Sequence, residues 1–167
     1  MTMNEVASPT AAIKGPDFWW EDLNRGDVLR GTGMTMTDAH LIQWAGLTGD
    51  TVPLHLDKEY ASTTRFGERI VHGPFTLALT LGLATQTGYF NNVVAWLGLD
   101  GLRALRPVVV GDTVRPEAEL IETRPAKNPD QGIWTFDYTT LNQRGESVMT
   151  FRSSLLIRRR CEGGSNA

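Results

Sequence analysis

Residues 73–84 read GPFTLALTLGLA, and this stretch decides the fold. Gly73 at the cap and Pro74 at the first position are typical of the start of a helix. The body that follows is apolar nearly all round and is interrupted only by Gly82. A helix without a polar face has to be covered on every side by other parts of the fold. We therefore expect a helix buried at the centre of the domain.

The sequence after Gly88 predicts the layer that covers this helix. Apolar and polar residues alternate there with a period of two, which is typical of strands with one buried face. Short turns between neighbours make those strands antiparallel. An earlier strand is expected around residues 27–36, so the pattern predicts an α+β fold with an antiparallel sheet wrapped around the central helix. The alternating segments are residues 114–120, 134–139 and 149–157, with turns at 111–112, 128–132 and 142–145.

Two shorter helices are expected before the central one. Thr37 is a suitable N-cap for the first, and Gly49 can end it in a left-handed conformation. A second helix is expected from the cap residue Asp57 to a point near Gly67. Asp50 therefore comes directly after a helix end. The apolar residues at helical spacing in the first helix are Leu41, Ile42, Ala45 and Leu47.

Length and composition limit the functional classes. The chain has 167 residues, of which 41% are hydrophobic, and this fits one domain with a substantial core. With 16 basic against 19 acidic residues it carries a formal charge of −3, so nucleic acid and anionic membranes are not expected partners. The single cysteine excludes an intramolecular disulfide and CxxC chemistry. A soluble protein of the reducing cytoplasm is expected, without a secretory signal or a membrane span.

The two ends of the chain differ from the middle. Residues 1–16 are small and polar, and residues 158–167 have no periodicity, so both are expected to be flexible tails. The three arginines at the start of the second segment are interpreted as a solvated chain end. This leaves residues 17–157 as a single domain.

The chain has three histidines, and two of them frame its most unusual stretch. His55 lies in the sequence GDTVPLHLD at residues 49–57, and His72 lies in IVHGP at residues 70–74. The interval from Asp50 to His55 crosses a helix end and a proline turn, so a carboxylate and an imidazole can face one cavity and activate a water. The same spacing also fits a turn capped by Asp50 and a buried, hydrogen-bonded His55. Spacing alone leaves both interpretations open.

Other kinds of site receive less support. The histidines lack HxxxH or HxH spacing and an obvious third strong ligand, so no metal is expected. GxSxG is absent, and no GxGxxG follows a strand. His40 is expected to be a surface or hydrogen-bonded side chain within the first helix. The tryptophans are interpreted as core or interface anchors: Trp19, Trp20, Trp44, Trp96 and Trp134.

Four blocks carry a resemblance to a known family. The sequence GD-x-x-P-L-H-x-D, followed by IVHG, resembles the MaoC-like dehydratase family of the hot-dog fold, which includes the (R)-specific enoyl-CoA hydratases. Two further blocks, WEDLNRGD at residues 20–27 and RPVVVGDT at residues 106–113, support the likeness. It extends over residues 18–157.

The resemblance implies a hydro-lyase of fatty acid metabolism that hydrates a 2-enoyl-CoA to a 3-hydroxyacyl-CoA, or the reverse, without metal or redox cofactor. Asp50 and His55 match the catalytic pair that shares the water, and Gly73 matches the residue whose backbone N–H binds the thioester oxygen. His72 is expected to support this turn beside the substrate. Val52 stands where members with the fullest motif have asparagine, which hints at a non-standard acyl group near this position.

The resemblance also implies an edge-to-edge homodimer, with CoA entering near the subunit boundary. An open-edged sheet with one apolar face supports a dimer independently. Arginines near the motifs are candidates for the CoA phosphates: Arg65, Arg69, Arg103 and Arg106. Two alternatives remain open, an acyl-CoA thioesterase on the same fold and a non-catalytic acyl-CoA-binding subunit.

Overall fold

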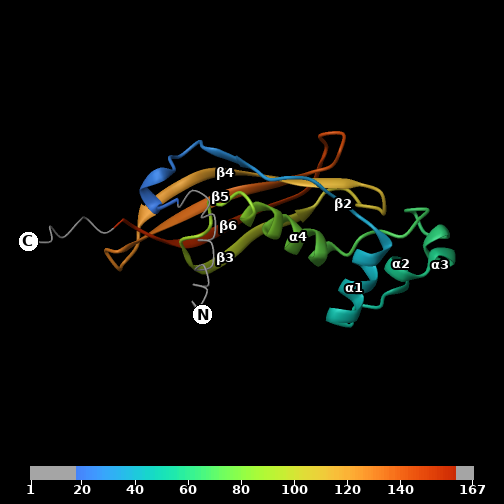
Figure 1. Ribbon diagram of the computed structural model, residues 1–167. Coiled ribbons are helices and arrows are strands. Elements are labelled where there is room, and N and C mark those ends of the chain that lie inside the picture. Colours follow the sequence, from blue (N-terminus) through green and yellow to red (C-terminus); the bar gives the residue numbers. More distant parts are fainter. Residues whose placement is uncertain (1–17, 161–167) are drawn as a thin grey trace, which may run out of the picture.

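The computed structural model describes residues 18–160. Within this range six strands form one antiparallel sheet in the order β1-β4-β5-β6-β3, and β2 pairs with β4 beside this path (Figure 1). The strands are β1 (Val28–Arg30), β2 (Met34–Thr35), β3 (Val93–Ala104), β4 (Thr113–Pro125), β5 (Gln131–Leu141) and β6 (Ser147–Arg158). The helices are η1 (Trp20–Asp22), α1 (Asp38–Thr48), α2 (Pro53–Leu56), α3 (Lys58–Ser62) and α4 (Gly73–Thr85).

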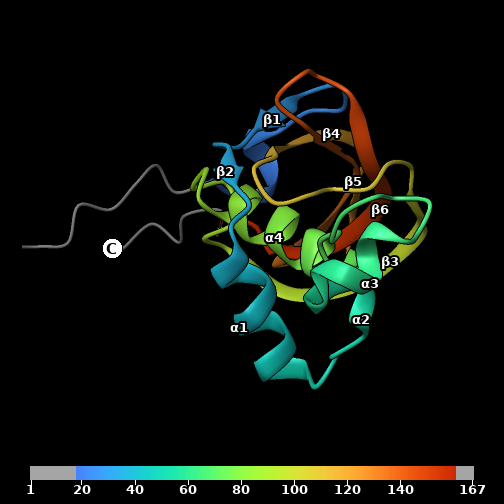
Figure 2. The same cartoon turned by 90° about the vertical axis from the view of Figure 1, so that its right-hand side faces the viewer.

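The sheet curves around one side of α4 (Figure 2). The expectation that this helix is covered on every side is wrong, because Thr80 and Leu83 are buried but Ala78 and Gly82 are exposed. The predicted α+β fold with a central helix is confirmed. One detail differs, because the N-cap is His72 and Gly73 is already the first helical residue. The buried hydroxyl of Thr80 on α4 has a hydrogen-bond partner. Its oxygen lies 2.7 Å from the Thr140 hydroxyl oxygen, and this contact fixes α4 against β5.

The alternation predicted for the strands is confirmed in β4 but not throughout β5, where residues 132–136 are all buried. In β4 the side chains of Val114, Ala118 and Leu120 are buried while Glu119 between them is exposed. The expected early strand is divided into β1 and β2. The chain passes so close to β4 between them that a Cβ on Gly31 would lie 2.5 Å from Pro116 Cγ. This close approach interrupts the regular ladder.

Helices α1, α2 and α3 gather at one end of the sheet, beyond the N-terminus of α4 (Figures 1 and 2). Helix α1 has the predicted cap Thr37 and ends at Gly49, which has φ +76°. The apolar spacing in α1 was only partly informative, because Leu41 and Ala45 are buried but Ile42 and Leu47 are exposed. The spacing of apolar residues within one helix does not predict which of them another element of the fold will cover.

The expected second helix is shorter than predicted. Asp57 caps it as expected, since its Oδ1 accepts from the backbone N–H of Tyr60 at 3.0 Å. The helix ends at Ser62 and not near Gly67. The hydroxyls of Thr63 and Thr64 donate to the Tyr60 and Ala61 carbonyls at 2.8 Å each, and such bonds compete with helix continuation.

The C-terminal boundary expected at residue 157 is too early. Strand β6 continues to Arg158, Arg159 Nε donates to Glu21 at 2.8 Å, and Arg160 Nη2 donates to Asp22 at 2.7 Å. These arginines tie the chain end to η1 and are not a solvated tail. The other residues of the two expected tails, 1–16 and 161–167, lie outside the described part of the chain. Among the described residues, no helix combines the length and apolar composition needed to cross a membrane.

Candidate active site

Two turn-forming residues, Gly49 and Pro53, place Asp50 and His55 close together. Gly49 ends α1 in the left-handed conformation and turns the chain at Asp50. Pro53 then starts the one-turn helix α2, which carries His55. A carboxylate oxygen of Asp50 and a ring nitrogen each of His55 and His72 all lie within 4.8 Å of one another. The expected approach of Asp50 to His55 agrees with this placement, but of the two only His55 lines the cavity beside them.

The hydrogen bond of His55 defines its tautomer. Its Nδ1 lies 2.7 Å from the carbonyl oxygen of Ile70. A carbonyl can only accept, so we assign the ring proton to Nδ1. The lone pair of Nε2 is therefore available to accept a proton from a bound molecule.

His72 supports both members of the pair. Its side chain is fully buried, and its Nε2–H donates to the Asp50 carbonyl oxygen at 3.1 Å. Its ring stacks on the His55 ring with 3.9 Å between centroids. Burial lowers the pKa of His72, and the hydrogen bond to Asp50 opposes this shift only in part. His72 is therefore a neutral support for the turn.

Gly73 stands at the other side of the site. As the first residue of α4 it has a backbone N–H outside the helical hydrogen-bond ladder. The dipole of a 13-residue helix favours negative charge at this point. A Cβ built on Gly73 would meet no atom within 4 Å, so a ligand can approach the backbone closely.

His55 and Gly73 line the same cavity, which has a volume of about 230 Å³. The other walls come from the loop before α4, the end of β3 and the start of β6. This lining is mainly apolar, with Thr76 and two arginines as its remaining polar side chains. The other lining residues are Arg65, Phe66, Ile70, Val71, Thr76, Ala104, Leu105, Arg106, Pro107, Val108, Val148 and Met149.

The structure places the remaining sequence candidates outside this cavity. Val52 precedes α2 with half of its surface exposed and is not among the lining residues. His40 accepts from the Thr37 backbone N–H at 3.1 Å, so it is a hydrogen-bonded residue of α1 as expected. Trp134 is a core residue, whereas Trp96 is exposed on β3.

Sequence reasoning named His72 as a support of the turn, and the structure places one of its ring nitrogens within 4.8 Å of Asp50 and His55. The same reasoning missed Thr76, which it treated only as part of an apolar helix, although Thr76 lines the cavity one turn after Gly73. The i, i+3 spacing from Gly73 is the signal that could have found Thr76.

Oxygen and nitrogen donors this close also raise the possibility of a metal ion. His72 uses Nε2 on the Asp50 carbonyl, and His55 uses Nδ1 on the Ile70 carbonyl. What remains is Nε2 of His55 and the Asp50 carboxylate, which lies within 4.8 Å of a nitrogen of the same ring, and these groups suit proton transfer to and from a water. The absence of a metal requirement stays a prediction.

The sequence of this chain matches a known protein family. The MaoC like domain family matches residues 24–140, which is more than half of the chain. This protein belongs to the MaoC-like domain family. The match contains Asp50, His55, His72 and Gly73.

Two MaoC-like relatives illustrate the range of protein sizes. The (R)-specific enoyl-CoA hydratase of Aeromonas caviae is 38% identical over 112 residues, which cover 67% of this chain and 79% of that enzyme. Protein MaoC of Klebsiella aerogenes is 37% identical over 97 residues, covering 58% of this chain but 29% of that protein. The matched segment thus spans less than a third of Protein MaoC.

Solved structures agree with the family assignment. The monoamine oxidase regulatory protein of Archaeoglobus fulgidus has a TM-score of 0.81 at 34% identity, covering 87% of this chain and 97% of its own. A Mycobacterium tuberculosis protein with a double hot-dog fold has a TM-score of 0.79 at 22% identity, covering 92% of this chain and 47% of its own. The fold of this MaoC-like protein is the hot-dog fold.

Proposed function

We propose that this protein is a hydro-lyase that adds water reversibly to a 2-enoyl-CoA thioester and gives a 3-hydroxyacyl-CoA. The proposal is carried by His55, whose Nδ1 is held by the Ile70 carbonyl and which lines one cavity together with Gly73. A ring nitrogen of His55 lies within 4.8 Å of an Asp50 carboxylate oxygen. The name of the Aeromonas caviae relative, an (R)-specific enoyl-CoA hydratase, supports the same reaction and suggests the (R) product.

Each of these groups has one task in the hydration. Asp50 and His55 hold the water between them, and His55 Nε2 accepts its proton as the oxygen attacks the β-carbon of the enoyl group. The double-bond electrons move toward the thioester oxygen, where the Gly73 N–H and the helix dipole stabilise the negative charge. The α-carbon then takes a proton from the pair, which restores both groups. Dehydration follows the same steps in reverse.

His72 contributes by staying neutral. A charged ring stacked on His55 would repel the proton that His55 must accept. Because burial lowers the pKa of His72, only one imidazole of the stacked pair carries charge during turnover. We assign His72 a positioning role and no direct contact with the substrate.

We also propose that the active form is a homodimer joined along β3. This strand pairs only with β6 within the described residues, so its other edge is open. It presents a row of exposed apolar side chains, which on a free edge favour pairing with a second copy. They are Val94, Trp96, Leu97 and Leu102. Ala104, at the end of β3, lines the catalytic cavity.

The test is incubation of the purified protein with short, medium, branched and dicarboxylic 2-enoyl-CoA thioesters. Loss of the conjugated-thioester absorbance without release of free thiol is the expected result. Release of thiol would instead identify a thioesterase. Binding without either change would identify a non-catalytic acyl-CoA-binding subunit.

Variants of the pair show whether it carries the reaction. Asp50→Asn and His55→Gln should each reduce kcat by about 100-fold or more, because general acid–base groups contribute that much. Asp130→Asn, in the turn between β4 and β5, is the control for loss of a carboxylate. Normal thermal unfolding of all three variants would show that folding is intact. Turnover near the wild-type rate in either site variant would contradict the assignment.

A further inference from the structure

Two guanidinium groups stand at the cavity that contains His55 and Gly73. Arg65, from the loop after α3, and Arg106, just after β3, both line it. No carboxylate from the described residues lines the same cavity, and its other walls are mainly apolar. Two cations without a lining anion make this cavity suited to a negatively charged group.

The other two candidate arginines, Arg69 and Arg103, do not line this cavity. Arg69 forms an ion pair with Asp38 on α1. Arg103 lies outside the cavity and donates to the neighbouring Leu102 carbonyl. Within residues 18–160, by contrast, Arg65 makes no ion pair, and its guanidinium lies 4.8 Å from the centre of the Phe66 ring. Its donors are therefore free for a ligand.

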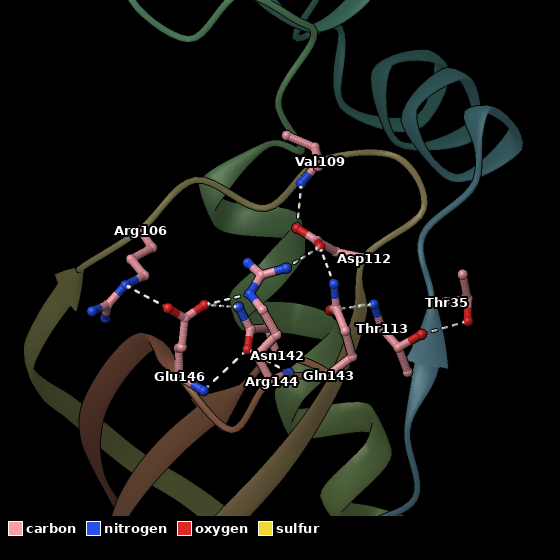
Figure 3. A network of polar contacts seen from close by, with 9 residues as sticks. All are labelled: Thr35, Arg106, Val109, Asp112, Thr113, Asn142, Gln143, Arg144 and Glu146. Atoms are coloured by element: carbon pink, nitrogen blue, oxygen red, sulfur yellow. Dashed lines mark hydrogen bonds and ion pairs between the residues drawn. The ribbon is translucent and has the colours of Figure 1, made fainter.

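Arg106 is fixed in place by the turn between β5 and β6. Its Nη1 donates to the Ser147 carbonyl at 2.8 Å, and its Nε lies 3.9 Å from the Glu146 carboxylate. Glu146 in turn accepts from Asn142 and Arg144 at 2.8 Å each, as Figure 3 shows. One carboxylate is thus shared between two arginines, and it leaves Arg106 with unused donors. The network orders the side chain before a ligand arrives.

The position of the two arginines decides between the anions of an acyl-CoA. The arm of CoA between its sulfur and its first phosphate is about as long as four residues of chain, and it reaches about 14 Å when extended. A sphere with the volume of this cavity, about 230 Å³, is about 8 Å across, which is shorter than the CoA arm. With the thioester at His55 and Gly73, the phosphates of an extended CoA would lie outside it. An anionic group on the acyl side would remain within it.

We propose that the natural substrate is a 2-enoyl thioester whose acyl group carries a second carboxylate, and that Arg65 and Arg106 bind this carboxylate. The proposal rests on the hydratase function argued above. It makes these arginines the residues that determine specificity.

The first experiment compares kcat/KM for two enoyl-CoA thioesters of equal chain length, one ending in a methyl group and one in a carboxylate. Wild-type protein should prefer the carboxylated substrate. In Arg65→Met and Arg106→Met the ratio of the two kcat/KM values should fall about tenfold or more, as expected for loss of a charged hydrogen bond. Arg124→Met, on β4, removes a cation outside the cavity and should preserve the wild-type ratio.

A second arm distinguishes the carboxylate from the phosphates of CoA. The same two acyl groups are presented on pantetheine, which has no phosphate. If the arginines bind the carboxylate, the variants lose the preference on both carriers. If they bind the phosphates, the variants lose equally on both CoA substrates and lose nothing on pantetheine, which would overturn the proposal. So would a wild-type preference for the methyl-ended substrate.

A binding measurement separates failure of this proposal from failure of the hydratase function. Saturated acyl-CoA thioesters cannot be hydrated, so succinyl-CoA and butyryl-CoA can be compared by calorimetry. Tighter binding of succinyl-CoA, weakened by Arg65→Met and Arg106→Met but not by Arg124→Met, would support the anion site even without turnover. Equal binding of the two thioesters would reject it even if the enzyme hydrates simple enoyl-CoA substrates.

Discussion

His72 shows at the scale of one residue how a buried histidine can shape a site without touching the substrate. It holds the backbone of Asp50 through Nε2 and the ring of His55 by stacking. Its Nδ1 is buried and has no hydrogen-bond partner among the described residues. Protonation of this nitrogen would place an unpaired charge inside the protein, which is unfavourable.

This burial predicts a pH dependence of stability. The pKa of His72 is lower in the folded chain than its ordinary value of about 6.5, so the unfolded chain binds the proton more readily. The stabilisation is complete above pH 6.5 and decreases as the pH falls below it. Urea unfolding should therefore show that wild-type protein loses more stability between pH 7.5 and 5.5 than His72→Gln does. Equal losses would show that His72 does not titrate in this way.

Gly73 allows a test of close approach at the helix N-terminus. Its φ is not in the left-handed region, and an added Cβ would meet no atom within 4 Å. Gly73→Ala should therefore fold with an unchanged melting temperature. Because the methyl group would occupy the space beside the N–H, we expect kcat/KM to fall about tenfold or more. A normal rate would place the thioester elsewhere.

At the scale of elements, η1 is attached to the sheet by one tryptophan. The Trp20 Nε1–H donates to the Ile133 carbonyl at 3.3 Å, and the Trp20 carbonyl accepts from Trp134 Nε1 at 3.2 Å. The ring lies directly over Gly132 at the start of β5, where a Cβ would be 2.3 Å from it. The ion pairs of Arg159 and Arg160 strengthen the same attachment.

Gly132→Ala should separate η1 from the sheet. The methyl group cannot fit beneath the Trp20 ring, so we expect a loss of about 1–3 kcal/mol in the free energy of unfolding. The control is Gly46→Ala on the exposed side of α1, where a Cβ meets nothing within 4 Å. Alanine there should be neutral or should stabilise by up to about 1 kcal/mol. Denaturant unfolding of both variants measures the difference.

At the scale of the whole molecule, the open edge of β3 is the proposed dimer interface. Leu97→Asp places a charge among the exposed apolar side chains of this strand and should convert a dimer to monomer in sedimentation experiments. Leu47→Asp is the control, since Leu47 is more exposed still and lies on α1 and not on β3. A monomeric wild-type protein, or a Leu97→Asp variant that stays dimeric, would contradict the proposed interface.

The elements of this fold follow from local interactions, and for this reason they were predictable. The helix cap Thr37, the left-handed Gly49 and the proline at the start of α4 act within a few residues. The buried and exposed faces of β4 follow from alternation alone, whereas residues 132–136 of β5 are buried on both faces. Predictions were wrong where contact with another element determines burial or pairing. Examples are the exposed Ile42 and Leu47 and the C-terminal arginines that pair with η1.

By itself, the sequence determined the central helix and the antiparallel sheet, because each depends on local spacing, and its motif predicted the pairing of Asp50 with His55 through a family resemblance. Only the tertiary structure decided how His72 supports the turn: its Nε2 donates to the Asp50 carbonyl, 22 residues away, and its ring stacks on His55. It also decided that Arg65 and Arg106, and not Arg69 or Arg103, line the cavity. The physical reason is that a cavity forms where distant segments meet, and their meeting depends on how the sheet curves around α4.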